Sequence, residues 1–350
     1  MNSNYYKDLT QFLLNNKWLI QGGINEQEFT TSTRSEIRNH FAKAGWKEDT
    51  PQYRPVRTTF TPPETGIPVK MVDGKLFRHS SVVDQITKNK EVTRRFLDSR
   101  NVPLPVGADF SRDEKEIARL YFQTFSGPIV VKPTNSGGSK GVTVGVRTKE
   151  DFEKGWDLAT ANPNTKRVLL EEQVGGVELR LFVIDDRVAA TVARVQPFVI
   201  GDGKTPLEVL ISEANESRSR NFRHRRNPIV PAPEFLGQQS ISLDLTPSKD
   251  QVVFLSPFTT LRAGGVNIDV TSYVSPDILS IGVRAAKAIP GLRIAGVDVL
   301  VSDLTNAQGA KVLEVNTAPA IDIHRFPSIG TPIDLPELIV GYFIENPNGT

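Results

Sequence analysis

The segment from Ile129 to Val146 restricts the possible folds more than any other part of the chain, because it predicts two short strands joined by a glycine-rich loop. A P-loop and a Rossmann turn each lead from a strand into a helix, so a loop between two strands fits neither of them. Glycines let successive backbone N–H groups approach an anion closely, and small hydroxyls add donors. The residues concerned are Lys132 at the base of the loop and Ser136, Gly137, Gly138, Ser139 and Gly141 within it. They predict either a flap over nucleotide phosphates or an ordinary hairpin loop.

The composition excludes several classes of site. The chain has 350 residues, enough for two or three domains, and it has no cysteine, which removes disulfide scaffolds, thiolate metal sites and cysteine nucleophiles. Its formal net charge is only +2, and this near balance argues against a bulk nucleic-acid binder. No secretory signal opens the sequence, and no apolar stretch reaches the roughly 20 residues of a membrane span. These absences predict a cytoplasmic protein with no membrane partner.

The order of the expected elements favours an α+β architecture with more than one domain. Helices are expected over residues 5–16, 33–44, 80–100, 148–159 and 276–288, and a hairpin over residues 69–77 around Asp73-Gly74. Strands are expected at residues 129–132, 142–146, 167–172, 179–184, 188–195, 296–301 and 311–316. Residues 205–208 predict a further helix start, with a capping box between Thr205 and Glu208.

Oxygen-bearing side chains in two late strands predict a metal site. Asp298 alternates with valines in one strand, while Glu314 and Asn316 lie two residues apart in the next and therefore share a face. If the two strands are neighbours, the three side chains converge, and such oxygen donors suit Mg²⁺. The alternative is that the carboxylates form salt bridges at strand edges.

The segment VLLEEQVGGVELRLFV predicts a hinge between two strands. Glu171 and Glu172 end the first strand, two glycines interrupt it, and Glu178 and Arg180 resume on a common face. Such a hinge offers free backbone groups to an adenine edge, and the acid beyond it can accept ribose hydroxyls. The alternative is a solvent-exposed connection without a ligand.

Taken together and in order, seven segments resemble the ATP-grasp superfamily, and most closely the ATP-grasp module of cyanophycin synthetases and of bifunctional glutathione-forming enzymes. They are ITKNKEVTRRFLDSRNVPLP, VVKPTNSGGSKGV, VLLEEQVGGVELR, ARVQPFVIGDGKTPLEVLI, LRAGGVNIDVT, AGVDVLV and EVNTAPAIDIH. The resemblance implies an ATP-grasp fold in which two α+β lobes clasp ATP. The expected domains are residues 1–83 before the clasp, 84–174 with the glycine flap, and 175–350 with the metal site.

The resemblance also implies residue roles. Lys90 and Lys132 contact phosphates, Glu171 lies on the adenine side, and Glu178 meets the ribose. The backbone of Glu172 and Val174 meets the adenine edge. Asp298, Glu314 and Asn316 bind magnesium, and Arg194 and Arg262 lie at the transferring phosphate. Many ATP-grasp ligases place that arginine two residues before the metal aspartate, where this chain has Gly296.

The implied activity is that of an ATP-dependent carboxylate–amine ligase, which forms an amide or peptide bond through an acyl-phosphate. ATP and Mg²⁺ are the implied cofactors, with two ions expected and Mn²⁺ as a substitute. Amino acids or peptides are the implied acid and amine, and a homodimer or homotetramer is the family expectation. A small-molecule kinase and a non-catalytic nucleotide-binding regulator remain the alternatives.

Two further groups of residues are expected near the implied site. Arg180, His324 and Arg325 are expected to contact substrate, although His324 also reads as a packed loop residue. The cluster between Arg218 and Arg226 holds five arginines and predicts a solvated loop, an acidic-substrate contact or an RNA contact.

Overall fold

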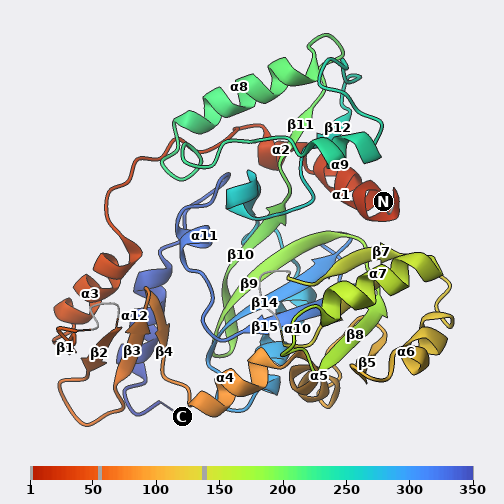
Figure 1. Cartoon of the computed structure of the whole chain (residues 1–350). Helices are drawn as coiled ribbons and strands as arrows, with labels where there is room; N and C mark the ends of the chain where they lie inside the picture. Colours follow the sequence, from red (N-terminus) through yellow and green to blue (C-terminus); the bar gives the residue numbers. More distant parts are fainter. Residues whose placement is uncertain (1–2, 54–56, 136–139, 350) are drawn as a thin grey trace.

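The computed structural model describes residues 3–53, 57–135 and 140–349. Three larger antiparallel sheets organise these residues, together with helices and a smaller strand pair (Figure 1). The predicted α+β class is therefore confirmed. Ser136, Gly137, Gly138 and Ser139, on which the predicted phosphate flap depends, lie outside the described residues.

The N-terminal part contains three helices and a four-stranded meander. Its elements are α1 (Ser3–Asn15), α2 (Lys17–Ile20), α3 (Thr33–Lys43), β1 (Lys47–Asp49), β2 (Arg57–Thr61), β3 (Val69–Val72) and β4 (Lys75–Phe77). The predicted hairpin at residues 69–77 is confirmed, because β3 pairs with β4 and Asp73 takes the left-handed conformation that a tight turn requires. Helix α1 does not belong to the meander: Leu9, Phe12 and Leu13 enter the largest core, which they share with strands from much later in the chain.

A second part is a four-stranded sheet in the order β5-β8-β6-β7, on which the helices at Lys115–Phe122 and Lys149–Thr160 pack. Its elements are α4 (Ser81–Lys88), α5 (Lys90–Asp98), β5 (Gly107–Ser111), α6 (Lys115–Phe122), β6 (Ile129–Pro133), β7 (Thr143–Val146), α7 (Lys149–Thr160) and β8 (Arg167–Glu172). Strands β6 and β7 pair antiparallel, so the glycine-rich segment does connect two strands.

One predicted helix, residues 80–100, is in fact two. Asn89 adopts an extended backbone with φ −104° and ψ 104°, which ends α4. Its side-chain oxygen then accepts hydrogen bonds from the N–H groups of Glu91 and Val92 and so caps α5. The single-helix prediction was wrong because asparagine competes for backbone donors instead of continuing a helix. The break places Lys90 at the first position of α5.

The third part is a five-stranded sheet in the order β13-β10-β9-β14-β15, in which every pair is antiparallel. The strands are β9 (Val177–Ile184), β10 (Arg187–Val195), β13 (Val266–Asp269), β14 (Ile294–Val301) and β15 (Lys311–Asn316), and the remaining elements around them are η1 (Leu261–Ala263), α10 (Pro276–Ala288), α11 (Asp322–Arg325) and α12 (Leu335–Glu345). One face packs on α10. The helix lies close to the sheet at Gly282, where an added Cβ would come within 2.6 Å of the Leu181 side chain. The other face carries Phe182 and Ile184 under α12 at one end and charged side chains at the other.

Between β10 and β13 the chain forms a small extra unit with its own core. It consists of β11 (Phe198–Ile200), α8 (Leu207–Ser219), α9 (Pro233–Gln238) and β12 (Val252–Phe254). The helix predicted near residue 205 exists, but its capping box does not form. Thr205 instead bonds to Asp202, whose carboxylate accepts from the N–H groups of Lys204 and Thr205 as well. Asp202 therefore organises a turn before the helix, and the helix begins two residues later without a side-chain cap.

The arginine-rich cluster is not the solvated loop that the sequence favoured. Arg218 and His224 are buried, and Arg218 donates to the backbone carbonyls of Asn227 and Gly264. Arg220 pairs with Glu26 at 2.7 Å, which ties the cluster to the N-terminal segment that crosses above the sheet (Figure 1). Most arginines of the cluster therefore make contacts within the protein. Such contacts are expected for the buried members, because burying a donor without a partner is costly.

Candidate active site

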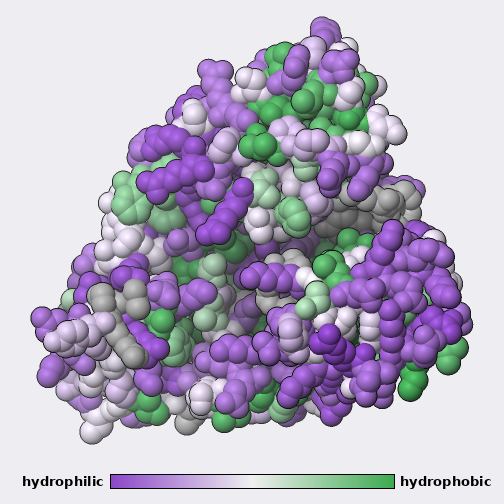
Figure 2. Space-filling view, viewed as in Figure 1, coloured by the Kyte–Doolittle hydropathy of each residue, from purple (hydrophilic) through white to green (hydrophobic). Residues whose placement is uncertain are grey.

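A hollow of about 410 Å³ lies between the second and third parts of the molecule. Four of the residues predicted to contact nucleotide or metal line it: Lys90 from α5, Lys132 from β6, Glu171 from β8 and Glu314 from β15. These positions are scattered over 225 residues of sequence. Figure 2 shows that this face of the molecule is hollowed near its middle, in front of the sheet that Figure 1 draws there.

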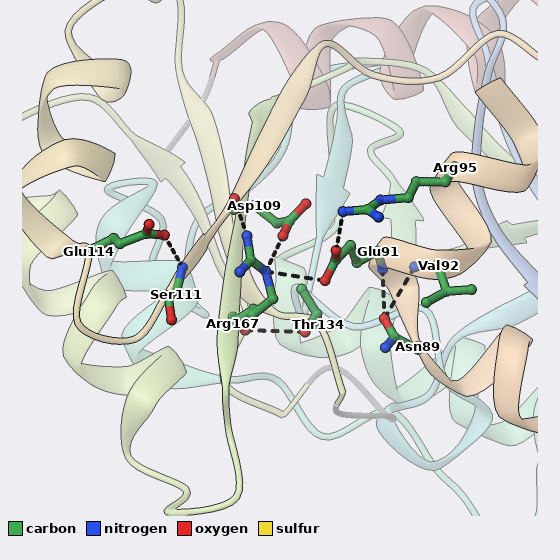
Figure 3. A network of polar contacts seen from close by, with 9 residues as sticks. All are labelled: Asn89, Glu91, Val92, Arg95, Asp109, Ser111, Glu114, Thr134 and Arg167. Atoms are coloured by element: carbon green, nitrogen blue, oxygen red, sulfur yellow. Dashed lines mark hydrogen bonds and ion pairs between the residues drawn. The ribbon is translucent and has the colours of Figure 1, made fainter. Parts of the chain in front are cut away.

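A network of polar contacts fixes the start of α5 against the second sheet (Figure 3). Arg167 on β8 pairs with Asp109 on β5 and, at 3.2 Å, with Glu91 on α5. The Lys90 N–H donates to the carbonyl of Thr134, at 3.0 Å. The helix start that carries Lys90 is thereby attached to the end of the strand that carries Lys132.

Three of the charged groups that line this hollow are paired with one another. Lys132 forms an ion pair with Glu171, and the other oxygen of that carboxylate lies 3.6 Å from Arg94. Burial lowers the pKa of Lys90, while Glu314 acts in the opposite direction. Arg94 was missed in the sequence analysis, although it follows Lys90 by four residues and therefore shares its helix face.

The hinge between β8 and β9 has the predicted glycines. Gly176 has a φ of 127°, and a Cβ there would come within 2.4 Å of the carbonyl of Val301, so only glycine fits without a shift. The Glu172 N–H donates to the Val106 carbonyl, and its carboxylate accepts from the Val106 N–H at 2.9 Å. The Glu172 N–H is therefore already used, and the adenine contacts predicted for the backbone of Glu172 and Val174 stay predictions.

Charged residues continue from the hollow across the third sheet. Asp298 on β14 lies opposite Glu314 on β15, and Gly296 lies opposite Asn316, so the three predicted metal ligands occupy neighbouring strands. On the other side, β9 places Arg180 opposite Asp298. The observed register is therefore consistent with the prediction that the three side chains converge.

Asp298 is held by arginines. The guanidinium of Arg180 binds both its oxygens in a fork, and Arg194 lies 3.8 Å away. Although burial opposes it, this pairing raises the pKa of Arg180. Arg194 also binds Glu178, whose pKa is raised to about 6 by burial, against the effect of Arg194.

The donor set fits Mg²⁺ in its chemistry, since two carboxylates and an amide oxygen are hard ligands. The side-chain nitrogen of Asn316 is buried without a partner, so its amide is not committed elsewhere through that atom. Within the described residues, no group of three or more His, Asp or Glu side chains converges tightly enough to hold an ion. An ion that uses Asp298 therefore has to compete with Arg180.

Gly296 stands two residues before Asp298, where an arginine was expected, and this glycine has a steric reason. A Cβ at Gly296 would lie 2.7 Å from the Pro319 Cβ and 3.1 Å from the Arg180 Cδ. Arg180 thus passes through the space beside that position. Of the two arginines predicted at the transferring phosphate, Arg194 lies near Asp298, whereas Arg262 is exposed at the end of η1.

The two remaining predicted substrate contacts lie apart from the open part of the sheet. His324 is 1% exposed and stands edge-on to Phe182, and burial, followed by Arg180, lowers its pKa to about 3. Arg325 pairs with Glu36 at 3.5 Å and donates to the Thr31 carbonyl. In this conformation His324 is packed as the alternative prediction described, and Arg325 secures the N-terminal segment. Both substrate roles stay predictions.

Comparisons with known proteins point to one class. Residues 105–200 match the family model described as D-ala D-ala ligase C-terminus. Together with the mixed helices and antiparallel sheets, this confirms the predicted resemblance to ATP-grasp ligases, which use ATP and Mg²⁺ in general. Among the described residues, no helix combines the length and the apolar character that crossing a bilayer requires.

The particular relatives are those that the sequence suggested. The chain is 29% identical over 276 residues to cyanophycin synthetase of Synechocystis sp., covering 76% of this chain and 31% of that protein. It is 30% identical over 267 residues to the glutathione biosynthesis bifunctional protein GshAB of Clostridium perfringens, covering 73% and 34%. The chain thus spans about a third of the length of these relatives. In fold it resembles the crystal structure of a bifunctional glutathione synthetase from Pasteurella multocida, with a TM-score of 0.62, 24% identity and coverage of 89% of this chain and 43% of that one.

Proposed function

We propose that this chain is an ATP-dependent ligase that joins a carboxylic acid to an amine. The observation that carries the proposal is the meeting of Lys90, Lys132, Glu171 and Glu314 around one hollow, beside Asp298. A site for phosphates needs cations on rigid elements, and a site for magnesium needs oxygen donors next to it. The chain's similarity to two biosynthetic enzymes, cyanophycin synthetase and GshAB, supports the same activity.

Charge sets the first requirement of the mechanism. A substrate carboxylate and the triphosphate of ATP repel each other, so positive charge has to stand where they meet. Lys90 and Lys132 supply it on the phosphates, and Arg194 supplies it on the transferring group. When bound by Asp298, Glu314 and Asn316, Mg²⁺ adds Lewis-acid stabilisation of the phosphoryl oxygens.

The chemistry then proceeds in two steps. A carboxylate oxygen attacks the γ-phosphorus in line, the bond to the β-γ bridging oxygen breaks, and ADP leaves with an acyl-phosphate formed. The amine then attacks the acyl carbon, loses a proton, and expels inorganic phosphate. Water has to be excluded from the site at this stage, because it would otherwise hydrolyse the acyl-phosphate. No protein nucleophile is needed, in keeping with the absence of cysteine.

The finer features are proposed with it. The acid and the amine are amino acids or short peptides, two Mg²⁺ ions take part and Mn²⁺ can replace them, and the assembly is a homodimer or homotetramer in the cytoplasm. Glu178 contacts the ribose, with its neighbour Arg194 keeping it oriented. The domain boundaries at residues 83 and 174 are part of the proposal as well.

The test is a phosphate-release screen with pairs of amino acids and short peptides, followed by mass detection of the products. A ligase releases ADP and phosphate only when acid and amine are both present, and the new product has the summed mass less one water. A product that retains the phosphate and contains no amide would identify a kinase. Nucleotide binding without turnover for every pair would favour a regulator and overturn the ligase.

A further inference from the structure

A second hollow, also of about 410 Å³, lies on the side of the third sheet where β14 begins. Its lining residues come from the end of β4 and the residues after it, from the turn before β14, and from α12 and the segment that follows it. It shares no lining residue with the first hollow. Its walls are formed by Phe77, Arg78, His79, Gly291, Arg293, Ile294, Tyr342, Phe343 and Gly349.

Arg78 is the principal charged group of this second hollow. Its Nη1 donates to the Asn346 carbonyl at 2.6 Å, and its guanidinium lies over the ring of Phe343, 4.7 Å from the ring centroid. Its Nε and Nη2 atoms are buried and have no hydrogen-bond partner. In residues 3–53, 57–135 and 140–349, no carboxylate lies within ion-pair distance of this guanidinium.

The two unpartnered nitrogens form one edge of the guanidinium. Nε–H and Nη2–H point the same way, and together they bind the two oxygens of a carboxylate or phosphate in a fork. Among the described residues, other arginines bind both oxygens of one carboxylate through this edge. Arg180 binds Asp298 through Nε and Nη2, and Arg38 binds Glu48 through the same two atoms. In Arg78 the same two atoms are buried and have no hydrogen-bond partner.

The rest of the hollow suits an anion with an apolar body. The Nε atom of Arg293 is likewise buried without a partner, while its Nη1 pairs with Asp185 at 2.8 Å. Three aromatic rings, those of Phe77, Tyr342 and Phe343, line the walls. Burial lowers the pKa of Arg78, which reflects the cost of holding a cation away from water without a counter-ion. Buried N–H groups of a charged side chain are rarely left without an acceptor.

We propose that the second hollow is a binding site for a small oxyanion, a carboxylate or a phosphate. The unpartnered edge of Arg78 holds two of its oxygens, Arg293 Nε donates a further hydrogen bond, and the aromatic rings cover the body of the ligand. The site is separate from the one proposed for ATP and does not depend on the ligase activity.

The test is calorimetric titration of the whole chain, at fixed ionic strength, with two probes, sodium benzoate and inorganic phosphate. We expect one of the probes to bind saturably at one equivalent per chain. The tighter probe tells whether the oxyanion is a carboxylate on a flat ring or a phosphate. Arg78→Lys keeps the charge but removes the fork, and should weaken binding about tenfold or more. Arg112→Lys, at an exposed arginine, is the matched control and should bind as the wild type does.

Two further variants keep the result interpretable. Arg293→Gln should weaken binding by a smaller factor than Arg78→Lys does, because it removes one donor only. Lys132→Met, in the first hollow, should leave binding of the probe unchanged. The proposal is overturned if neither probe binds saturably below about 10 mM, or if Arg78→Lys binds like the wild type while its melting temperature is unchanged. It is also overturned if Lys132→Met abolishes binding while circular dichroism shows that the variant is folded.

Discussion

The two hollows have similar volumes and each contains two or more cations, yet they treat those cations differently. In the first, Lys132 shares the carboxylate of Glu171 with Arg94, and the arginines beside it share Asp298. In the second, Arg78 has no carboxylate partner among the described residues. In the first hollow, carboxylates compensate the charge of the cations until a polyanion binds together with its metal ion. In the second hollow, a cation without a counter-ion favours the binding of one small anion.

The largest effect is expected at the metal-side acid of the first hollow. Glu314→Ala removes a carboxylate that faces Asp298 across the strand pair, so the phosphoryl oxygens lose their metal-held stabilisation. We expect turnover to fall by about a thousandfold or more, on the scale of losing one strong electrostatic contact in a transition state. The measurement is ADP release with the best acid and amine pair.

The control for this variant is Glu213→Ala on the exposed side of α8, which should keep wild-type turnover. Both variants should melt like the wild type, because the Glu314 side chain is exposed as well. Full activity in Glu314→Ala would remove this residue from the metal site and leave the first hollow without its main acid.

The second effect concerns the buried ion pair itself. Lys132→Met removes the nearest cation from the Glu171 carboxylate, which is 6% exposed, and leaves it with Arg94 at 3.6 Å. Removing one member of a buried pair costs about 3 kcal/mol or more, whereas removing both is often nearly neutral. We therefore expect a large loss of unfolding free energy in Lys132→Met, and recovery of most of it in the double variant Lys132→Met/Glu171→Leu. Denaturant unfolding of the four proteins in this cycle measures the coupling, and additive losses would show that the pair is not a stabilising unit.

The third effect is a pH dependence of stability from two buried histidines that do not line the first hollow. Burial lowers the pKa of His324 and of His224 to about 3, with Arg180 adding to the first and Arg218 to the second. A lowered folded-state pKa contributes stability that is complete above pH 6.5 and is lost as the pH falls toward 3. At pH 5 each histidine should cost roughly 2 kcal/mol. Thermal unfolding at pH 7.5 and pH 5 of wild type and of His324→Asn measures this, and an equal drop in both proteins would contradict the assignment to His324.

The site of the first hollow could be predicted from sequence because its residues follow strand periodicity. Glu314 and Asn316 share a face through their spacing alone, and the short connection from β14 to β15 brings Asp298 opposite Glu314. The pairing of Arg180 with Asp298 could not be predicted, since the two residues are 118 positions apart and meet only through the register of β9 against β14. Local spacing carries no information on which distant strands become neighbours.

The errors have a similar origin. The arginine cluster appeared solvated because its partners are far away in sequence: Arg220 meets Glu26 at a separation of 194 residues. The break at Asn89 and the failed cap at Thr205 are local, and both arise because a short polar side chain bonds to the nearest free backbone donors. The sequence does not single out Arg78, because an arginine can be recognised as unpaired only when its neighbours in space are known.

The smallest effect is expected in the second hollow and separates the two regions most directly. Arg78→Met removes a cation that has no carboxylate to leave behind, and methionine keeps much of the packing on Phe343. The loss of the bond to the Asn346 carbonyl is offset by relief from burying an unpaired charge, so the unfolding free energy should change by less than about 1 kcal/mol. Turnover should stay within about twofold of wild type, because the residue lies outside the first hollow. Denaturant unfolding beside Lys132→Met makes the comparison. A loss in Arg78→Met as large as in Lys132→Met would mean that Arg78 has a structural counter-ion after all, and that the two hollows treat their cations alike.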